Sequence, residues 1–115
     1  MGKVQGYKFE KSWFLLKVRE KCIEQYKKYH ANVSDSQNAV LKKHGWDNFS
    51  LFIRPDGLLF GYVETPESFH ASLAGLNTEK VNTEWQALMA PLFEITEGER
   101  PDTSMIELEE IYHLD

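Results

Sequence analysis

Tyr26 and His30 are the two residues of this 115-residue sequence whose types and spacing best fit acid/base chemistry. Residues four apart on a helix project from the same face, so the phenol and the imidazole would lie side by side. Imidazole gains and loses protons near neutrality, with an unperturbed pKa of about 6.5, and a phenol can hold a hydroxyl-bearing ligand or relay a proton. The spacing fits an ordinary helix end equally well. Tyr26 would then pack inward and His30 would lie near the helix C-terminus, where a cation is favoured.

Three aromatic residues, Trp46, Phe49 and Trp85, could present flat rings to a ligand. Such rings pack well against the apolar C–H side of a sugar. Trp85 and Phe49 would fit an ordinary hydrophobic core just as well, and their spacing alone favours that interpretation.

Sequence motifs for metal, nucleotide or covalent chemistry are missing. The histidines at positions 30, 44, 70 and 113 form no HxH, HxxxH or HExxH pattern, which leaves only a metal site assembled from distant parts of the chain. There is no GxSxG, GxGxxG or GxxxxGK[ST] pattern. Cys22 is the only cysteine, so no intramolecular disulfide can form, and its apolar helical neighbours are typical of a buried, inert thiol. We therefore expect no metal and no cofactor.

The composition predicts one packed domain and a small partner. Hydrophobic residues make up 42% of a chain whose length suits a single domain. The formal net charge of -5, with no long basic run, argues against a nucleic acid partner. The apolar runs are too short to span a bilayer, and no N-terminal apolar segment points to secretion. We therefore expect no membrane partner and a cytoplasmic location.

The first half of the chain contains the elements that must position Tyr26 and His30. Trp13–Val18 is typical of a strand, and from Glu20 onward apolar residues recur at helical spacing through Tyr26. A second helix is predicted over Asp35–Lys43. Its start carries the capping-box pattern Ser34-x-x-Gln37, in which a serine and a glutamine side chain cap the first helical turn.

The second half predicts a hairpin, two helices and a last strand. The hairpin turns at Arg54-Pro55-Asp56-Gly57, where proline, aspartate and glycine each suit a tight turn. Thr65-Pro66-Glu67 and Asn77-Thr78-Glu79 are helix-start signals. The segments predicted around them are strands at Phe49–Ile53 and Leu58–Val63, a loop at Ile95–Ser104 and a strand at Met105–Leu114.

This order of elements predicts an α+β fold with an antiparallel sheet and helices on one face. We divide the chain into a flexible lead-in of residues 1–11 and a single domain of residues 12–115. The uncovered face of the sheet would carry side chains too apolar for water, so we expect a second subunit to cover it. The residues assigned to that face are Leu15, Leu51, Phe60 and Tyr62.

The order and spacing of several short runs carry a resemblance to a known family. The pattern Y-x-x-x-H at positions 26–30 is followed by LKKHGWDNFSLF at 41–52, LLFGYVE at 58–64, Trp85 with Met89, and EIYHLD at 110–115. Together, from about Trp13 to the last residue, these runs resemble the L-rhamnose mutarotase family. The resemblance implies a ferredoxin-like fold that dimerises into a shared α+β barrel. It also implies interconversion of the α and β anomers of L-rhamnose without cofactor or metal.

The resemblance also implies roles for individual residues. The acid/base histidine of the family falls on His30, its substrate-contacting tyrosine on Tyr26, and its first sugar-contacting tryptophan on Trp85. Two positions depart from the pattern: Phe49 stands where members commonly have a substrate-contacting tyrosine, and Gln86 stands where one family pattern has a second tryptophan.

A third departure lies before the second helix, where the chain has Val33-Ser34-Asp35-Ser36 and the family often has Val-Trp-Pro-Glu. The serine cap preserves the helix start, but the tryptophan is lost. We expect this change to affect ligand recognition and to leave the fold intact.

We therefore predict a homodimeric isomerase, a cofactor-free mutarotase of L-rhamnose or a related 6-deoxy hexose. His30 would be the general acid/base with Tyr26 as its partner. A non-catalytic sugar-binding or regulatory protein on the same dimeric α+β-barrel scaffold is the first alternative, and a small α+β-barrel oxygenase is the second. The residues predicted to bind the monosaccharide are Tyr26, Phe49, Trp85, Gln86 and Trp46.

Overall fold

The computed structural model describes residues 9–115, and its strands form one antiparallel sheet. Within these residues the sheet has four strands in the order β2-β3-β1-β4. β1 (Glu10–Lys17) and β3 (Leu58–Thr65) form its centre, whereas β2 (Asp47–Ile53) and β4 (Ile106–Leu108) form its edges. The hairpin predicted around Asp56-Gly57 is confirmed, because β2 pairs with β3 across that turn.

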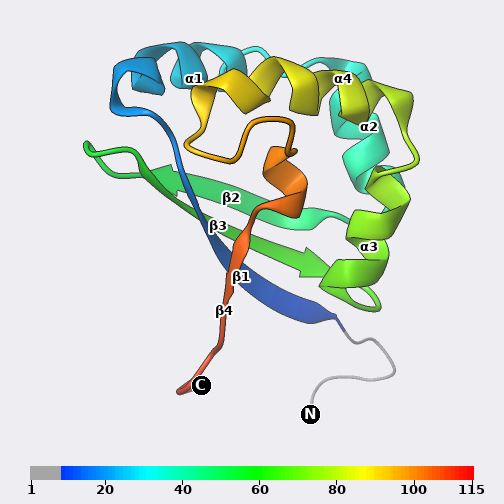
Figure 1. Cartoon of the computed structure of the whole chain (residues 1–115). Helices are drawn as coiled ribbons and strands as arrows, with labels where there is room; N and C mark the ends of the chain where they lie inside the picture. The colour runs from blue at the N-terminus through cyan, green and yellow to red at the C-terminus, as the bar shows by residue number, and fades with distance from the viewer. Residues whose placement is uncertain (1–8) are drawn as a thin grey trace.

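The helices gather on one side of this sheet (Figure 1). They confirm the α+β class, and short 3-10 turns occur at Glu20–Cys22, Ala90–Leu92 and Pro101–Thr103. The α-helices of the described part of the chain are α1 (Ile23–His30), α2 (Asp35–Lys43), α3 (Phe69–Leu76) and α4 (Lys80–Met89).

The core lies between the sheet and the helices because the two central strands alternate buried and less buried residues. Phe14 of β1 lies opposite Gly61 of β3, and a β-carbon at Gly61 would collide with the Phe14 ring. Glycine at this position therefore makes room for the aromatic ring. Phe14 stacks on Phe69 of α3, which ties the helical layer to the sheet.

Helix α2 begins as the sequence predicts, but its capping box is only half formed. The Ser34 Oγ accepts a hydrogen bond from the Gln37 backbone N–H at 3.1 Å. The Gln37 side chain does not return to Ser34. It donates instead to Asn82 of α4 at 3.1 Å, so a residue expected to cap the helix points into the interior.

Two sequence-based boundaries were wrong. Thr65 ends β3, and Ser68 is the residue that caps α3, its Oγ accepting from the Ala71 N–H at 3.0 Å. The start signal at Asn77-Thr78-Glu79 is confirmed, because α4 begins directly after it at Lys80, although Glu79 provides no side-chain cap. The predicted strand at Met105–Leu114 shrinks to Ile106–Leu108, because only these residues pair with β1.

The predicted lead-in overlaps the first strand. Residues 1–8 lie outside the described residues, and Glu10 and Lys11 already pair with β3 as part of β1.

The centre of the sheet face that points away from the helices is apolar. Strand pairing places Trp13 opposite Tyr62 and Leu108, and Leu15 opposite Phe60 and Ile106. Leu51 does not belong to this outer face as predicted, because its partner is the buried, inward-facing Gly61. We call the apolar residues of this face the outer sheet face; they are Trp13, Leu15, Phe52, Phe60, Tyr62, Ile106 and Leu108.

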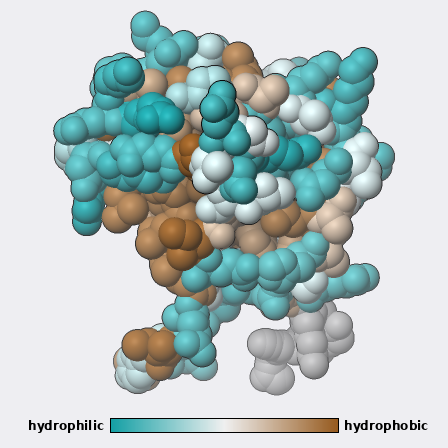
Figure 2. Space-filling model, viewed as in Figure 1, coloured by the Kyte–Doolittle hydropathy of each residue, from teal (hydrophilic) through white to brown (hydrophobic). Residues whose placement is uncertain are grey.

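This outer sheet face is only partly covered by the chain itself. Phe52 and Ile106 expose 58% and 63% of their surface, and Ile111 beyond β4 exposes 89%. In Figure 2 hydrophobic side chains gather below the helical layer and again at the C-terminal tail. No helix within residues 9–115 is long and apolar enough to cross a membrane.

Candidate active site

A cavity of about 320 Å³ lies between the sheet and the helices. Its walls are mostly apolar with a small number of polar side chains, which is the usual composition of a small-molecule site. The sheet contributes Phe14, Leu16, Leu51 and Leu59, and the helices contribute Tyr26, His30, Gln37, Asn82, Trp85 and Gln86.

His30 ends α1 and borders this cavity with a defined tautomer. Its Nδ1 lies 2.9 Å from the backbone carbonyl oxygen of Tyr26. A carbonyl oxygen can only accept, so Nδ1 carries the proton and donates it. In the neutral ring, Nε2 is therefore left with a free lone pair and can act as a base.

Burial favours the neutral ring. Desolvation lowers the pKa of His30 from its ordinary value, and the hydrogen bond to the Tyr26 carbonyl opposes part of that change. The imidazole is consequently uncharged at neutral pH. It can accept a proton there without first losing one.

Tyr26 is both a core residue and a wall of the cavity. It exposes only 5% of its surface and meets Phe93 edge-on, so it packs inward as the structural interpretation of the sequence suggested. Its ring centroid also lies 4.2 Å from that of His30. Burial raises the pKa of the Tyr26 phenol well above its ordinary range, which keeps the hydroxyl protonated and suits it to hydrogen bonding rather than to proton abstraction.

Trp85 extends the aromatic wall on the far side of His30. It comes from α4 and meets the imidazole edge-on, with ring centroids 5.3 Å apart. Three rings from two helices, those of Tyr26, His30 and Trp85, thus lie in sequence along the cavity. Trp85 was the tryptophan that the sequence assigned to stacking on a sugar.

Trp46 and Phe49 lie near the start of β2 and form another part of the lining. Their rings meet edge-on at 5.5 Å, and Trp46 is almost fully buried. The Trp46 indole Nε1 is buried and lacks a hydrogen-bond partner within residues 9–115. Phe49 exposes 37% of its surface and offers no polar group, so this side of the cavity contributes shape and a single donor.

Gln86 is brought into the cavity as well, but within a polar wall that the sequence did not reveal. It lies on α4 with Asn82, four residues earlier on the same helix face. Asp102 joins them from the turn at Pro101–Thr103, and Gln37 joins them from α2. Helical spacing could have linked Asn82 to Gln86, whereas no local signal places Asp102 or Gln37 in the same wall.

Metal-binding geometry is absent from the part of the chain that the structure describes. No three histidine, cysteine or acidic side chains of residues 9–115 come together in a set that could hold an ion. His44 and His70 bind single carboxylates, those of Glu79 and Glu107, on other parts of the surface.

Fold and site together define a small α+β protein with a mostly apolar cavity that a histidine and a tyrosine border. The family model described as L-rhamnose mutarotase matches residues 11–114. The L-rhamnose mutarotase of Lactiplantibacillus plantarum is 30% identical over 99 residues, covering 85% of this chain and 91% of the relative. That of Tolumonas auensis is 34% identical over 97 residues, covering 84% of this chain and 88% of the relative. The chain therefore belongs to the L-rhamnose mutarotase family.

A solved structure supports the fold. The crystal structure of an L-rhamnose mutarotase from Formosa agariphila superposes with a TM-score of 0.72, at 23% sequence identity, covering 92% of this chain and 99% of that one. The order of strands and helices is thus a known architecture.

The lowered pKa of His30 predicts its pH response. The folded chain holds the ring neutral, so just below pH ~6.5 the folded state binds fewer protons than the unfolded state. Above the pKa of His30 in the unfolded chain, the neutral ring therefore makes its full contribution to the free energy of unfolding. That contribution is lost as the pH falls through the lower pKa of His30 in the folded chain. We expect the His30 ring resonances, followed by NMR, to titrate with a midpoint below pH ~6.5.

The His30→Ala variant assigns the resonance in this titration, because its spectrum lacks that signal. A midpoint at or above pH ~6.5 would show that partial burial does not lower the pKa of His30.

Proposed function

We propose that this chain interconverts the α and β anomers of L-rhamnose, or of a related 6-deoxy hexose. Membership of the L-rhamnose mutarotase family supports the substrate class. The observation that carries the proposal is the orientation of His30: its Nδ1–H is fixed on the Tyr26 carbonyl, which leaves Nε2 free beside a cavity of suitable size.

The reaction needs one proton to move from one sugar oxygen to another. His30 Nε2 removes the proton of the anomeric hydroxyl while the bond between C1 and the ring oxygen breaks. The ring oxygen takes a proton from the imidazolium, which gives the open aldehyde and restores the neutral histidine. Rotation about the C1–C2 bond presents the other face of the aldehyde, and the same steps in reverse close the ring as the other anomer.

General acid/base catalysis of this kind typically contributes about 10²- to 10⁴-fold. No electrons are gained or lost between the two anomers, so the chemistry requires neither a redox cofactor nor a group carrier. We propose that the enzyme works without cofactor or metal.

The remaining site residues would hold the sugar against His30. Tyr26 stays protonated and can hydrogen-bond to a sugar oxygen, and Trp85 offers its ring to the C–H face. Phe49 offers only apolar contact where relatives were expected to carry a tyrosine. Gln86 and Trp46 would complete the binding wall.

A non-catalytic sugar-binding protein would need the same aromatic wall but no free histidine nitrogen. The fixed tautomer of His30 therefore favours the enzyme. A reducing compartment such as the cytoplasm suits its single, partly buried thiol, Cys22.

We also propose that the protein is a homodimer joined through the outer sheet face. Phe52 and Ile106 on this face are more than half exposed, and an apolar surface of this kind is usually covered by a partner. The tail beyond β4 projects away from the domain (Figure 1), with Tyr112 and Leu114 exposed by 76% and 77%. A second copy of the chain would bury both surfaces.

Anomer exchange measured by saturation-transfer NMR tests the proposed activity. Wild type should accelerate the exchange of L-rhamnose above the buffer rate, and His30→Ala should lose about 10²- to 10⁴-fold of that acceleration. His70→Ala is the matched control, because His70 is largely exposed on α3 and contacts Glu107 instead of the cavity.

Two results would contradict the proposal at different points. Wild type exchanging L-rhamnose and other 6-deoxy hexoses no faster than buffer would remove the activity. Normal exchange by His30→Ala would leave the activity in place but remove the role of His30.

Light scattering coupled to size-exclusion chromatography tests the dimer. Wild type should have twice the mass of one chain at micromolar concentration, and the double variant Phe52→Glu/Ile106→Glu should have the mass of one chain. Circular dichroism of the variant should match wild type, because both positions are exposed in the single chain. A monomeric wild type would contradict the dimer.

A further inference from the structure

Gln37 has an unused hydrogen-bond acceptor at the cavity. Its side chain exposes only 3% of its surface, and its Oε1 is buried without a partner within residues 9–115. Buried polar atoms are almost always paired, so an orphaned acceptor beside a ligand cavity needs an explanation. In a complete capping box the Gln37 side chain would bond to the start of α2, but only the serine half of the cap forms.

The orientation of Gln37 follows from a chain of contacts that begins at an ion pair. Arg100 donates through Nε and an η nitrogen to both carboxylate oxygens of Asp102, each at 2.9 Å. Asp102 exposes 3% of its surface, and as a carboxylate it can only accept hydrogen bonds. The group that approaches it from Asn82 must therefore be the amide nitrogen.

The orientation of the Asn82 amide in turn fixes the orientation of two glutamine side chains. Its Nδ2 donates to the Asp102 carboxylate at 3.1 Å and to the Leu76 carbonyl at 3.3 Å, both of which only accept. Its Oδ1 must then be the atom that accepts, from Gln37 Nε2 at 3.1 Å and from Gln86 Nε2 at 3.3 Å.

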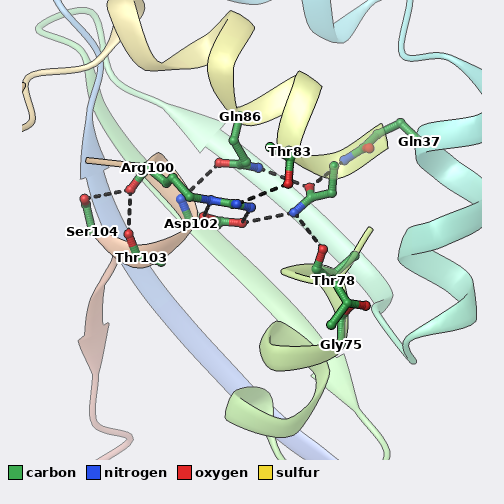
Figure 3. A network of polar contacts seen from close by, with 11 residues as sticks. Gln37, Gly75, Thr78, Thr83, Gln86, Arg100, Asp102, Thr103 and Ser104 are labelled. Carbon is green, nitrogen blue, oxygen red and sulfur yellow. Dashed lines mark hydrogen bonds and ion pairs between the residues drawn. The ribbon is translucent and has the colours of Figure 1, made fainter. Parts of the chain in front are cut away.

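Gln86 closes the network from the opposite direction. Its Oε1 accepts the backbone N–H of Asp102 at 3.0 Å, so its amide nitrogen is the end that reaches Asn82. Figure 3 shows Gln37, Gln86 and Arg100 with Asp102 converging from α2, α4 and the turn at Pro101–Thr103. With the Gln37 nitrogen bonded to Asn82, its oxygen is the buried side-chain atom that has no partner within residues 9–115.

We propose that the Gln37 Oε1 accepts a hydrogen bond from a non-anomeric ring hydroxyl of the sugar, which makes Gln37 a substrate-binding residue that selects for that hydroxyl. This role rests on the proposed function, in which His30 engages the anomeric hydroxyl. Asn82 and Asp102 act as positioning residues, because they fix which end of the Gln37 amide faces the cavity.

The indole of Trp46 complements this acceptor. Its Nε1–H is the other unpaired buried polar group of the cavity lining, and it can only donate. Besides the His30 nitrogen and the Tyr26 hydroxyl, the cavity thus offers one unpaired buried acceptor and one unpaired buried donor, and sugar hydroxyls can satisfy both. An apolar ligand would satisfy neither, which argues against a substrate without hydroxyl groups.

The experiment combines the Gln37→Met variant with 2-, 3- and 4-deoxy analogues of L-rhamnose. Methionine keeps the length of the side chain and removes the acceptor. Exchange is measured as kcat and KM, with each sugar normalised to its own uncatalysed rate, and Kd is measured by calorimetry on the same sugars. Wild type should discriminate by about tenfold in kcat/KM against one analogue, the size expected for one hydrogen bond.

Gln37→Met should lose about the same tenfold on L-rhamnose, chiefly through KM, and should show no further loss on that one analogue. Asp102→Asn should weaken the same discrimination, because an asparagine there can donate to Asn82 and release the orientation of Gln37. A purely structural role would lower stability in both variants and leave the ranking of the sugars unchanged.

Gln25→Met is the matched control, because Gln25 is exposed on α1 and its substitution should leave both kcat and KM unchanged.

If wild type exchanges L-rhamnose and Gln37→Met keeps its KM and its ranking of analogues, Oε1 binds only water and the inference is overturned while the function stands. If wild type binds sugars without exchanging them, the function fails and the Kd values decide on Gln37. Absence of both exchange and binding would overturn both.

Discussion

One hydrogen bond, from His30 Nδ1 to the Tyr26 carbonyl, decides which imidazole nitrogen is available for chemistry. The bond exists because His30 lies one helical turn after Tyr26 and ends α1. Packing of Tyr26 beneath α1, against Phe93, holds that turn in place. The proposed catalytic geometry therefore depends on a core residue and the end of a helix.

The cavity also presents polar groups inside an apolar core. The buried amides of Gln37 and Asn82 could adopt either orientation in isolation. The Arg100–Asp102 ion pair removes that freedom, because a carboxylate accepts and never donates. Such buried networks stabilise a fold only when each member finds its partners. Here the network leaves the Gln37 oxygen without a partner, on a residue that lines the cavity.

The sequence predicted the elements with local signals well. The Ser34 cap and the helix Asp35–Lys43 are confirmed, as is the hairpin at Asp56-Gly57, because both depend on residues within a few positions of one another. The strand at Met105–Leu114 was predicted too long, because its extent depends on pairing with a strand at the other end of the chain. A hydroxyl before proline suits both a helix cap and a strand end, so the sequence predicts a cap at Thr65 where the structure has the end of β3.

The candidate site shows the same division between local and distant signals. The proximity of Tyr26 and His30 follows from four-residue spacing, and the structure brings Trp85 beside them. The Gln37 side chain turns inward because it bonds to Asn82, which is 45 positions away in the sequence. The capping-box pattern therefore predicted the wrong contact for this side chain. No sequence pattern could place Asp102 under the same cavity.

The proposed mechanism depends most directly on the tautomer of His30, which ¹⁵N NMR of the imidazole ring measures. At a pH where the ring is neutral, the proton should reside on Nδ1, and adding L-rhamnose should perturb the unprotonated Nε2 while leaving the exposed His70 unchanged. A ring protonated on Nε2, or a His30 signal indifferent to the sugar, would contradict it.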